Sequence, residues 1–100
     1  MSNVEAMATL SEYLELALDK GRHLIMVRSQ SDTSTLYLGD ASSSDDELTK
    51  CGLIQNELAD AILESTRSGF NELTVNGGIY RFMRTFTQVG SKGAVVFAPV

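Results

Sequence analysis

The stretch that most constrains the fold of this chain is residues 79–89, which read IYRFMRTFTQV. It is long, apolar and rich in aromatic and β-branched residues, a composition that favours a β-strand. Successive side chains of a strand point to opposite faces of the sheet. Arg81 and Arg84 are three positions apart and must therefore point to opposite faces. If one face packs on a core, one of the two arginines shares that face.

The face of this strand that holds three aromatic side chains is predicted to pack on the core, because aromatic residues bury the most area. These residues are Tyr80, Phe82 and Phe86. Arg84 shares their face, so we expect it to lie at the core margin, to extend towards solvent, or to be shifted by a β-bulge. The opposite face carries Arg81, Met83 and Thr85. Since Met and Arg are enriched in protein interfaces, it is predicted to meet a partner. Apolar side chains scattered on a surface without function are the alternative.

An amphipathic helix is predicted near the N-terminus, from a Ser2–Glu5 capping-box pattern to Gly21. Apolar residues recur there at spacings of three and four, and Gly21 is suited to end the helix in a left-handed conformation. Tyr13 and Leu16 widen the apolar face beyond one stripe. Two interpretations stay open for them, a broad contact with the core and a second contact with another chain.

A second helix is predicted from the capping-box pattern of Ser44 and Glu47 to about Thr66, with Gly69 after its end. Apolar residues again recur at helical spacing. Gly52 lies inside this segment, where glycine is about 1 kcal/mol less favourable than alanine. A close approach of another backbone would explain a glycine at this position.

Five strands are predicted from short runs of β-favouring residues bounded by turn signals. Neighbouring strands should be antiparallel, because the links between them are too short for a parallel crossover. Asn76-Gly77 is a strong hairpin signal, and residues 90–93, GSKG, form a second tight turn. The predicted strands are residues 23–28, 35–38, 71–75, 79–89 and 94–98.

These elements predict one α+β domain over residues 1–100, with the order α-β-β-α-β-β-β. We expect a two-layer sandwich in which two helices cover one face of an antiparallel sheet of about five strands. Two packed helices lie about 10 Å apart, and five strands make a sheet about 24 Å across. No third helix is predicted, so the second face of the sheet is expected to need cover from another molecule.

The predicted element order resembles the roadblock and profilin-like arrangements, and the size and acidity resemble the small α/β dimers that act as secretion chaperones. The resemblance concerns order, size and charge, and no residues are shared that could carry a function over to this chain. A C-terminal helix, present in both patterns, is missing from the prediction.

The charge disfavours nucleic acid as a partner. The chain of 100 residues has a formal net charge of −5, whereas affinity for nucleic acid comes largely from basic residues that neutralise phosphates. The charge is uneven, because residues 1–66 hold twelve acidic and four basic residues, and residues 67–100 hold one acidic and four basic residues. The sequence shows neither a signal-peptide pattern nor an apolar run that would predict a membrane helix. We expect a soluble cytoplasmic protein, and the single Cys51 fits a reducing compartment.

The sequence carries no recognised catalytic or metal-binding motif. One His and one Cys, His23 and Cys51, do not make a zinc site, and Cys51 lies on an apolar stripe as a small buried residue would. Neither a phosphate-binding loop nor a Gly-x-Ser-x-Gly elbow occurs. We therefore expect no catalysis, no cofactor and no metal. The alternative is a small-molecule-binding domain or minor enzyme with a pocket between helices and sheet, in which His23 and Arg84 would converge.

The sequence therefore predicts a small acidic binding or adaptor protein that acts through the uncovered face of its sheet. Arg81, Met83 and Thr85 are the central candidate residues, and Tyr13 and Leu16 on the first helix are the secondary ones. The expected partner is another protein or a second copy of the chain. A homodimer through the sheet or its edge is the first candidate, because two-fold homodimers are the commonest assemblies.

Overall fold

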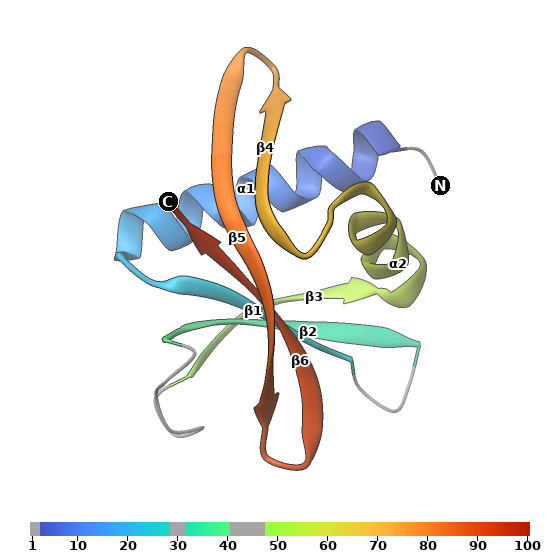
Figure 1. The fold of residues 1–100 in the computed structure, drawn as a ribbon. Coiled ribbons are helices and arrows are strands. Elements are labelled where there is room, and N and C mark those ends of the chain that lie inside the picture. Colours follow the sequence, from blue (N-terminus) through green and yellow to red (C-terminus); the bar gives the residue numbers. More distant parts are fainter. Residues whose placement is uncertain (1–2, 29–31, 41–47) are drawn as a thin grey trace.

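The structure is a computed structural model, and it describes residues 3–28, 32–40 and 48–100. Helices and strands follow one another in the order α-β-β-β-α-β-β-β, shown in Figure 1. The elements are α1 (Asn3–Lys20), β1 (His23–Arg28), β2 (Thr33–Gly39), β3 (Thr49–Gln55), α2 (Asn56–Ser65), β4 (Gly69–Val75), β5 (Gly78–Val89) and β6 (Lys92–Pro99).

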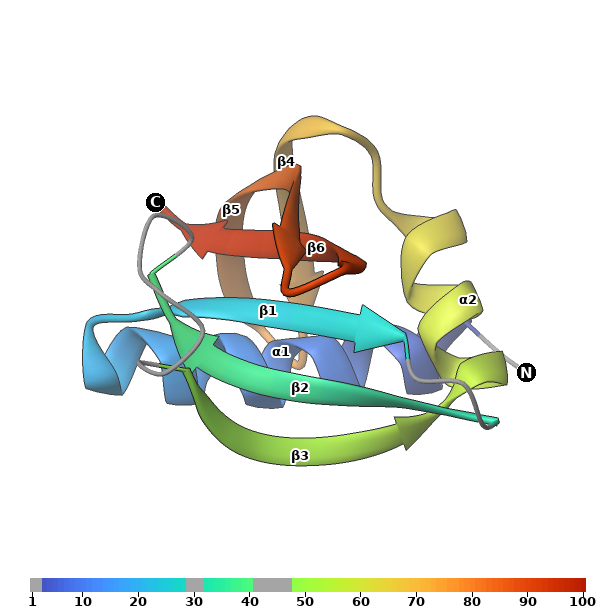
Figure 2. The same ribbon diagram turned by 90° about the horizontal axis from the view of Figure 1, so that it is seen from below.

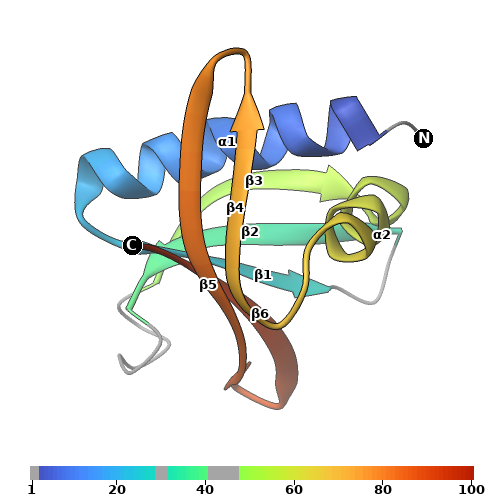
Figure 3. The same cartoon turned by 45° about the horizontal axis from the view of Figure 1, so that its top comes forward.

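The strands form one antiparallel sheet of six strands in the order β3-β2-β1-β6-β5-β4. Both helices contribute to the core on the same face of this sheet. Figure 1 shows them together above β1–β3, and Figure 3 shows the β4–β5 hairpin passing in front of α1. The predicted fold class, an α+β domain with two helices and an antiparallel sheet, is confirmed. The sheet has six strands instead of about five, because the chain forms a strand at β3.

Strand β3 corrects the prediction for the second helix. Residues 49–55 pair with β2, and helix α2 begins only at Asn56. The expected capping residues Ser44 and Glu47 lie outside the described residues. Gly52 sits opposite Leu36 in the ladder, and a Cβ atom there would lie 2.7 Å from two carbons of the Tyr13 ring. The glycine therefore accommodates a close side chain from α1, where we had expected a backbone.

Local turn signals were confirmed at two places. Helix α1 ends in a Schellman motif, in which the N–H of Gly21 donates to the Leu18 carbonyl at 3.1 Å and the N–H of Arg22 donates to the Ala17 carbonyl at 2.9 Å. Gly21 has a φ of +63°, a left-handed conformation that glycine adopts without a Cβ clash. Asn76 and Gly77 link β4 to β5 with φ values of 49° and 83°, as a type I′ hairpin turn requires.

The main core lies between the helices and the sheet. Its centre is formed by Phe82 of β5 and Phe97 of β6, which are fully buried and whose ring centroids lie 5.8 Å apart. Leu10 and Leu14 of α1 and Ile62 of α2 pack against the same cluster. Phe82 therefore faces the helices, as the side-chain alternation along β5 predicts.

A second, smaller core lies on the other face of the sheet. It consists of buried Ile25, Val27, Ala94 and Val96, with Tyr37, Leu48, Val89 and Ala98 packed around them. The β5–β6 hairpin runs across the direction of β1 and β2 in Figure 1, as expected when strand twist accumulates over a large sheet. Figure 2 shows β6 beside β1 and running in the opposite direction. Central strands β1 and β6 are buried on both faces. The second face was expected to be uncovered, and this expectation is wrong at the centre of the sheet. Among the described residues, the second face is exposed on the outer strands β4 and β5.

No helix in the described part of the chain is both long and apolar enough to cross a membrane.

Candidate interaction surface

The open part of the second face lies on β4 and β5. Arg81, Met83 and Thr85 are all exposed there, as predicted from strand alternation. Met83 is 39% exposed, and Ile79, two residues before Arg81, is 58% exposed. Phe70 of β4 pairs with Met83 in the ladder and is 45% exposed. We call the set the β4–β5 patch: Phe70, Glu72, Ile79, Arg81, Met83 and Thr85.

An ion pair lies in the middle of the β4–β5 patch. The Arg81 Nε donates to Glu72 Oε2 at 2.8 Å, and the two residues are directly opposite each other on neighbouring strands. Both side chains are about half-exposed, so the pair contributes only about 0.2–1 kcal/mol to folding. Its larger effect is on the surface, because it supplies one charge of each sign between exposed apolar side chains.

Arg84, the other arginine of β5, points to the helices. Its Nη1 donates to the Leu63 carbonyl at 3.0 Å and to the Thr66 hydroxyl oxygen at 2.8 Å. Both acceptors lie at the C-terminal end of α2, whose last turn holds no basic residue. A cation there satisfies free carbonyl groups and interacts favourably with the helix dipole. Arg84 therefore lies at the core margin, as the alternation of β5 predicts, and has a structural role.

The secondary candidates Tyr13 and Leu16 lie apart from the β4–β5 patch. Both are half-buried on α1 and pack against the main core, on the helix side of the sheet. The Tyr13 ring lies over Gly52. Burial raises the pKa of the Tyr13 phenol, and the nearby Cys51 and Glu12 raise it further. Two interpretations were left open for these residues, a contact with the core and a contact with another chain. The structure shows the contact with the core.

Sequence reasoning missed two features of this surface. Phe70 lies outside the predicted strand 71–75, because β4 begins two residues earlier, at Gly69. Phe70 occupies the same face as Glu72 and Thr74, so side-chain alternation could have placed it in the strand. Phe86 was assigned to the core face with the other aromatic residues, but it is 70% exposed. It lies two positions beyond Arg84, which contacts the last turn of α2, so the helix layer ends before it covers Phe86.

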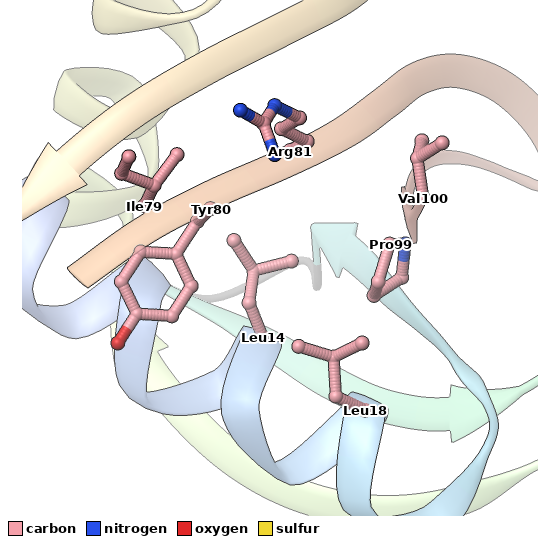
Figure 4. A pocket seen from close by; sticks show the side chains of 7 residues that line it. All are labelled: Leu14, Leu18, Ile79, Tyr80, Arg81, Pro99 and Val100. Atoms are coloured by element: carbon pink, nitrogen blue, oxygen red, sulfur yellow. The ribbon is translucent and has the colours of Figure 1, made fainter.

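A small cavity lies beside the β4–β5 patch, between α1, the start of β5 and the C-terminus (Figure 4). Its volume is about 80 Å³, whereas small-molecule sites are typically about 300–1,000 Å³. The lining side chains are mostly apolar, and Arg81 is the one charged residue among them. The cavity therefore offers little room for a metabolite. Its lining residues are Leu14, Leu18, Ile79, Tyr80, Arg81, Pro99 and Val100.

The alternative of a pocket built on His23 and Arg84 lacks the required geometry. Arg84 pairs with Phe97, and Phe97 pairs with Leu24, so these three residues share the helix face of the sheet. His23 precedes Leu24 on β1 and therefore belongs to the other face. Strand alternation thus separates His23 from Arg84, and the two polar groups do not converge.

Cys51 has the environment of an unreactive thiol. It lies at the register shift between β2 and β3 and packs against the main core. Burial raises the pKa of the Cys51 thiol above its ordinary value, which keeps it protonated and a poor nucleophile at neutral pH. Among the residues that the structure describes, no group of three or more His, Cys, Asp or Glu side chains could hold a metal ion.

Comparison with known proteins adds no assignment. No family model matches the chain. No curated protein and no solved structure matches it.

Proposed function

We propose that this is a non-catalytic binding protein that associates with a second copy of itself through the β4–β5 patch. The observation that carries the proposal is the exposure of Phe70, Ile79 and Met83 together on one face of two neighbouring strands. Exposed apolar side chains gathered on one face are typical of protein interaction sites. Their burial against a like surface would contribute about 25 cal/mol per Å² of apolar area removed from water.

The charge distribution favours self-association through this face over the helix layer. Exposed acidic residues lie along both helices, so two copies that meet through their helices would repel each other. They are Glu5, Glu12, Glu15 and Asp19 of α1 and Glu57, Asp60 and Glu64 of α2. The β4–β5 patch instead contains Arg81 and Glu72. Across a two-fold axis, each arginine can approach the glutamate of the other copy without net repulsion.

A reducing, cytoplasmic location forms part of the proposal, since the one cysteine of the chain, Cys51, cannot form an internal disulfide. The first experiment is the solution mass of the protein, measured by sedimentation velocity over a hundredfold range of concentration. The proposal requires a monomer–dimer equilibrium in which the dimer fraction rises with concentration. A single monomeric species at all concentrations would overturn it.

A further inference from the structure

Strand β4 forms one edge of the sheet, and its hairpin turn determines which backbone groups are free. In a two-residue hairpin the residues that flank the turn, here Val75 and Gly78, exchange hydrogen bonds. Bonded and non-bonded pairs then alternate along the ladder. The N–H and C=O groups of Phe70, Glu72 and Thr74 therefore point away from β5, towards the open edge.

These outward groups form an incomplete row of donors and acceptors. The Phe70 carbonyl accepts a hydrogen bond from the Arg67 Nε at 3.2 Å. In the described part of the chain, no backbone group outside the ladder bonds to Glu72 or Thr74. An edge of this kind is a template for a further strand unless lysine, proline or a bulge blocks it. Residues 69–75, GFNELTV, contain neither lysine nor proline, and their ladder has no register shift.

The opposite edge of the sheet is protected. Strand β3 carries Lys50, and its ladder with β2 has a register shift between Leu36 and Tyr37. Both features are common devices against edge-to-edge pairing. The two edges are therefore not equivalent: β4 has one charged residue, Glu72, but no lysine and no register shift, and beyond the Phe70 carbonyl its outward groups form a regular row.

Two depressions flank the β4 edge and would receive side chains of an added strand. One, of about 370 Å³, lies between the end of α2 and β4 and is lined by residues 64–67 with Asn71 and Glu72. The other, of about 270 Å³, lies between the start of α1 and the end of β4. Its lining includes Val4 and Met7 of α1. The first depression is polar and the second is largely apolar.

We infer that the β4 edge binds an extended, basic segment of another protein by strand addition. Exposed acidic residues lie along both helices that flank this edge, Glu64 lines the polar depression, and the whole chain has a net charge of −5. A lysine or arginine of the added segment would lie opposite these acids, and an apolar side chain would enter the depression beside Val4. Six or seven residues span the edge at about 3.3 Å each.

A second copy of the chain is a poorer occupant of this edge. The antiparallel register that uses all three outward residues pairs Glu72 with the same residue of the other copy, and like charges directly opposite each other are destabilising. Self-association through the β4–β5 patch uses side chains on the face of the strands, whereas strand addition uses backbone groups at the edge. This inference thus goes beyond the proposed function and stands without it.

The test uses a fluorescein-labelled seven-residue peptide with lysines in one half and valines in the other, titrated with the full-length protein and followed by fluorescence anisotropy. Thr74→Pro removes an outward N–H while keeping the β5 ladder, since proline is tolerated on edge strands. It should weaken binding at least tenfold. The matched control, Thr74→Val, keeps the N–H and should bind within twofold of the wild type. A peptide in which glutamate replaces lysine should bind at least tenfold more weakly.

Amide hydrogen exchange gives a second measurement that needs no variant. Saturating peptide should slow exchange at Glu72 and Thr74, whose N–H groups point outward, and leave the ladder amide of Leu73 unchanged. Absence of peptide binding to the wild type, equal binding by both Thr74 variants, or unchanged exchange at Glu72 and Thr74 would overturn the inference. Loss of self-association in Thr74→Pro would also overturn it, because the edge would then be occupied by a second copy.

Discussion

Arg81 and Arg84 lie three positions apart on β5 and face opposite sides of the sheet. Arg81 forms an exposed ion pair on the open face, and Arg84 binds the C-terminal end of α2 on the other. One strand thus carries two cations with different roles, one at a surface that can meet a partner and one that fastens a helix to the sheet.

Arg84→Ala should destabilise the fold more than Arg81→Ala. Loss of the Arg84 guanidinium leaves the Leu63 carbonyl and the Thr66 hydroxyl without their donor, which should lower the free energy of unfolding by about 1–3 kcal/mol. Loss of the exposed pair with Glu72 should lower it by less than about 1 kcal/mol. Urea denaturation followed by circular dichroism measures both variants. Equal effects would show that Arg84 does not hold α2 in place.

Met83→Lys should weaken self-association. The substitution places a charge among the exposed apolar side chains of the β4–β5 patch, and we expect the dimer dissociation constant to rise at least about tenfold, equivalent to about 1.4 kcal/mol. Phe86→Lys is the matched control, because Phe86 is also exposed on β5 but lies on the opposite face. Sedimentation velocity distinguishes them. If both variants dimerise like the wild type, or if Phe86→Lys alone loses the dimer, another surface carries the association.

Gly52→Ala should destabilise the protein because its Cβ would collide with the Tyr13 ring. We expect a decrease of about 1–3 kcal/mol in the free energy of unfolding, the usual effect of overpacking. Gly93→Ala is the control, since a Cβ at Gly93 would meet no atom within 4 Å. Combining Gly52→Ala with Tyr13→Ala should give a smaller loss than the sum of the two single variants. Additive losses in thermal or urea unfolding would count against the contact.

Stability should decline in alkaline solution, first through Cys51. The ordinary thiol pKa is 9.0, and burial raises the pKa of Cys51 in the folded chain. The unfolded chain therefore releases this proton at a lower pH than the folded chain does, so above about pH 9 the folded state binds more protons and loses stability as pH rises. Below this pH both states are protonated and the thiol has no effect.

Tyr13 acts in the same direction from its own ordinary value of 10.0, because burial raises its pKa in the folded chain. Cys51→Ala should therefore flatten the decline between about pH 9 and pH 10 and leave the later part from Tyr13 in place. Urea midpoints measured from pH 7 to pH 11 check this. An identical pH profile for the wild type and Cys51→Ala would contradict the role of the thiol.

Features that depend on neighbouring residues could be predicted from the sequence. Gly21 ends α1 because a left-handed conformation is needed one residue beyond the helix. Asn76 and Gly77 make the β4–β5 turn for a related reason. The division of β5 into two faces follows from side-chain alternation, and with it came the positions of Arg81, Met83 and Thr85 on one face.

Tertiary contacts decided the rest. Residues 49–55 carry a helical pattern of apolar residues, yet pairing with β2 and the Tyr13 ring above Gly52 make them a strand. Side chains from other segments, Tyr37, Leu48 and Val89, pack around the buried residues of β1 and β6 and close the centre of the second face. Helix α2 ends before it covers Phe86, which stays exposed. A local pattern specifies backbone conformation and the alternation of side chains, because those depend on adjacent residues. Which face is covered depends on where distant segments pack, and only the folded chain brings those segments together.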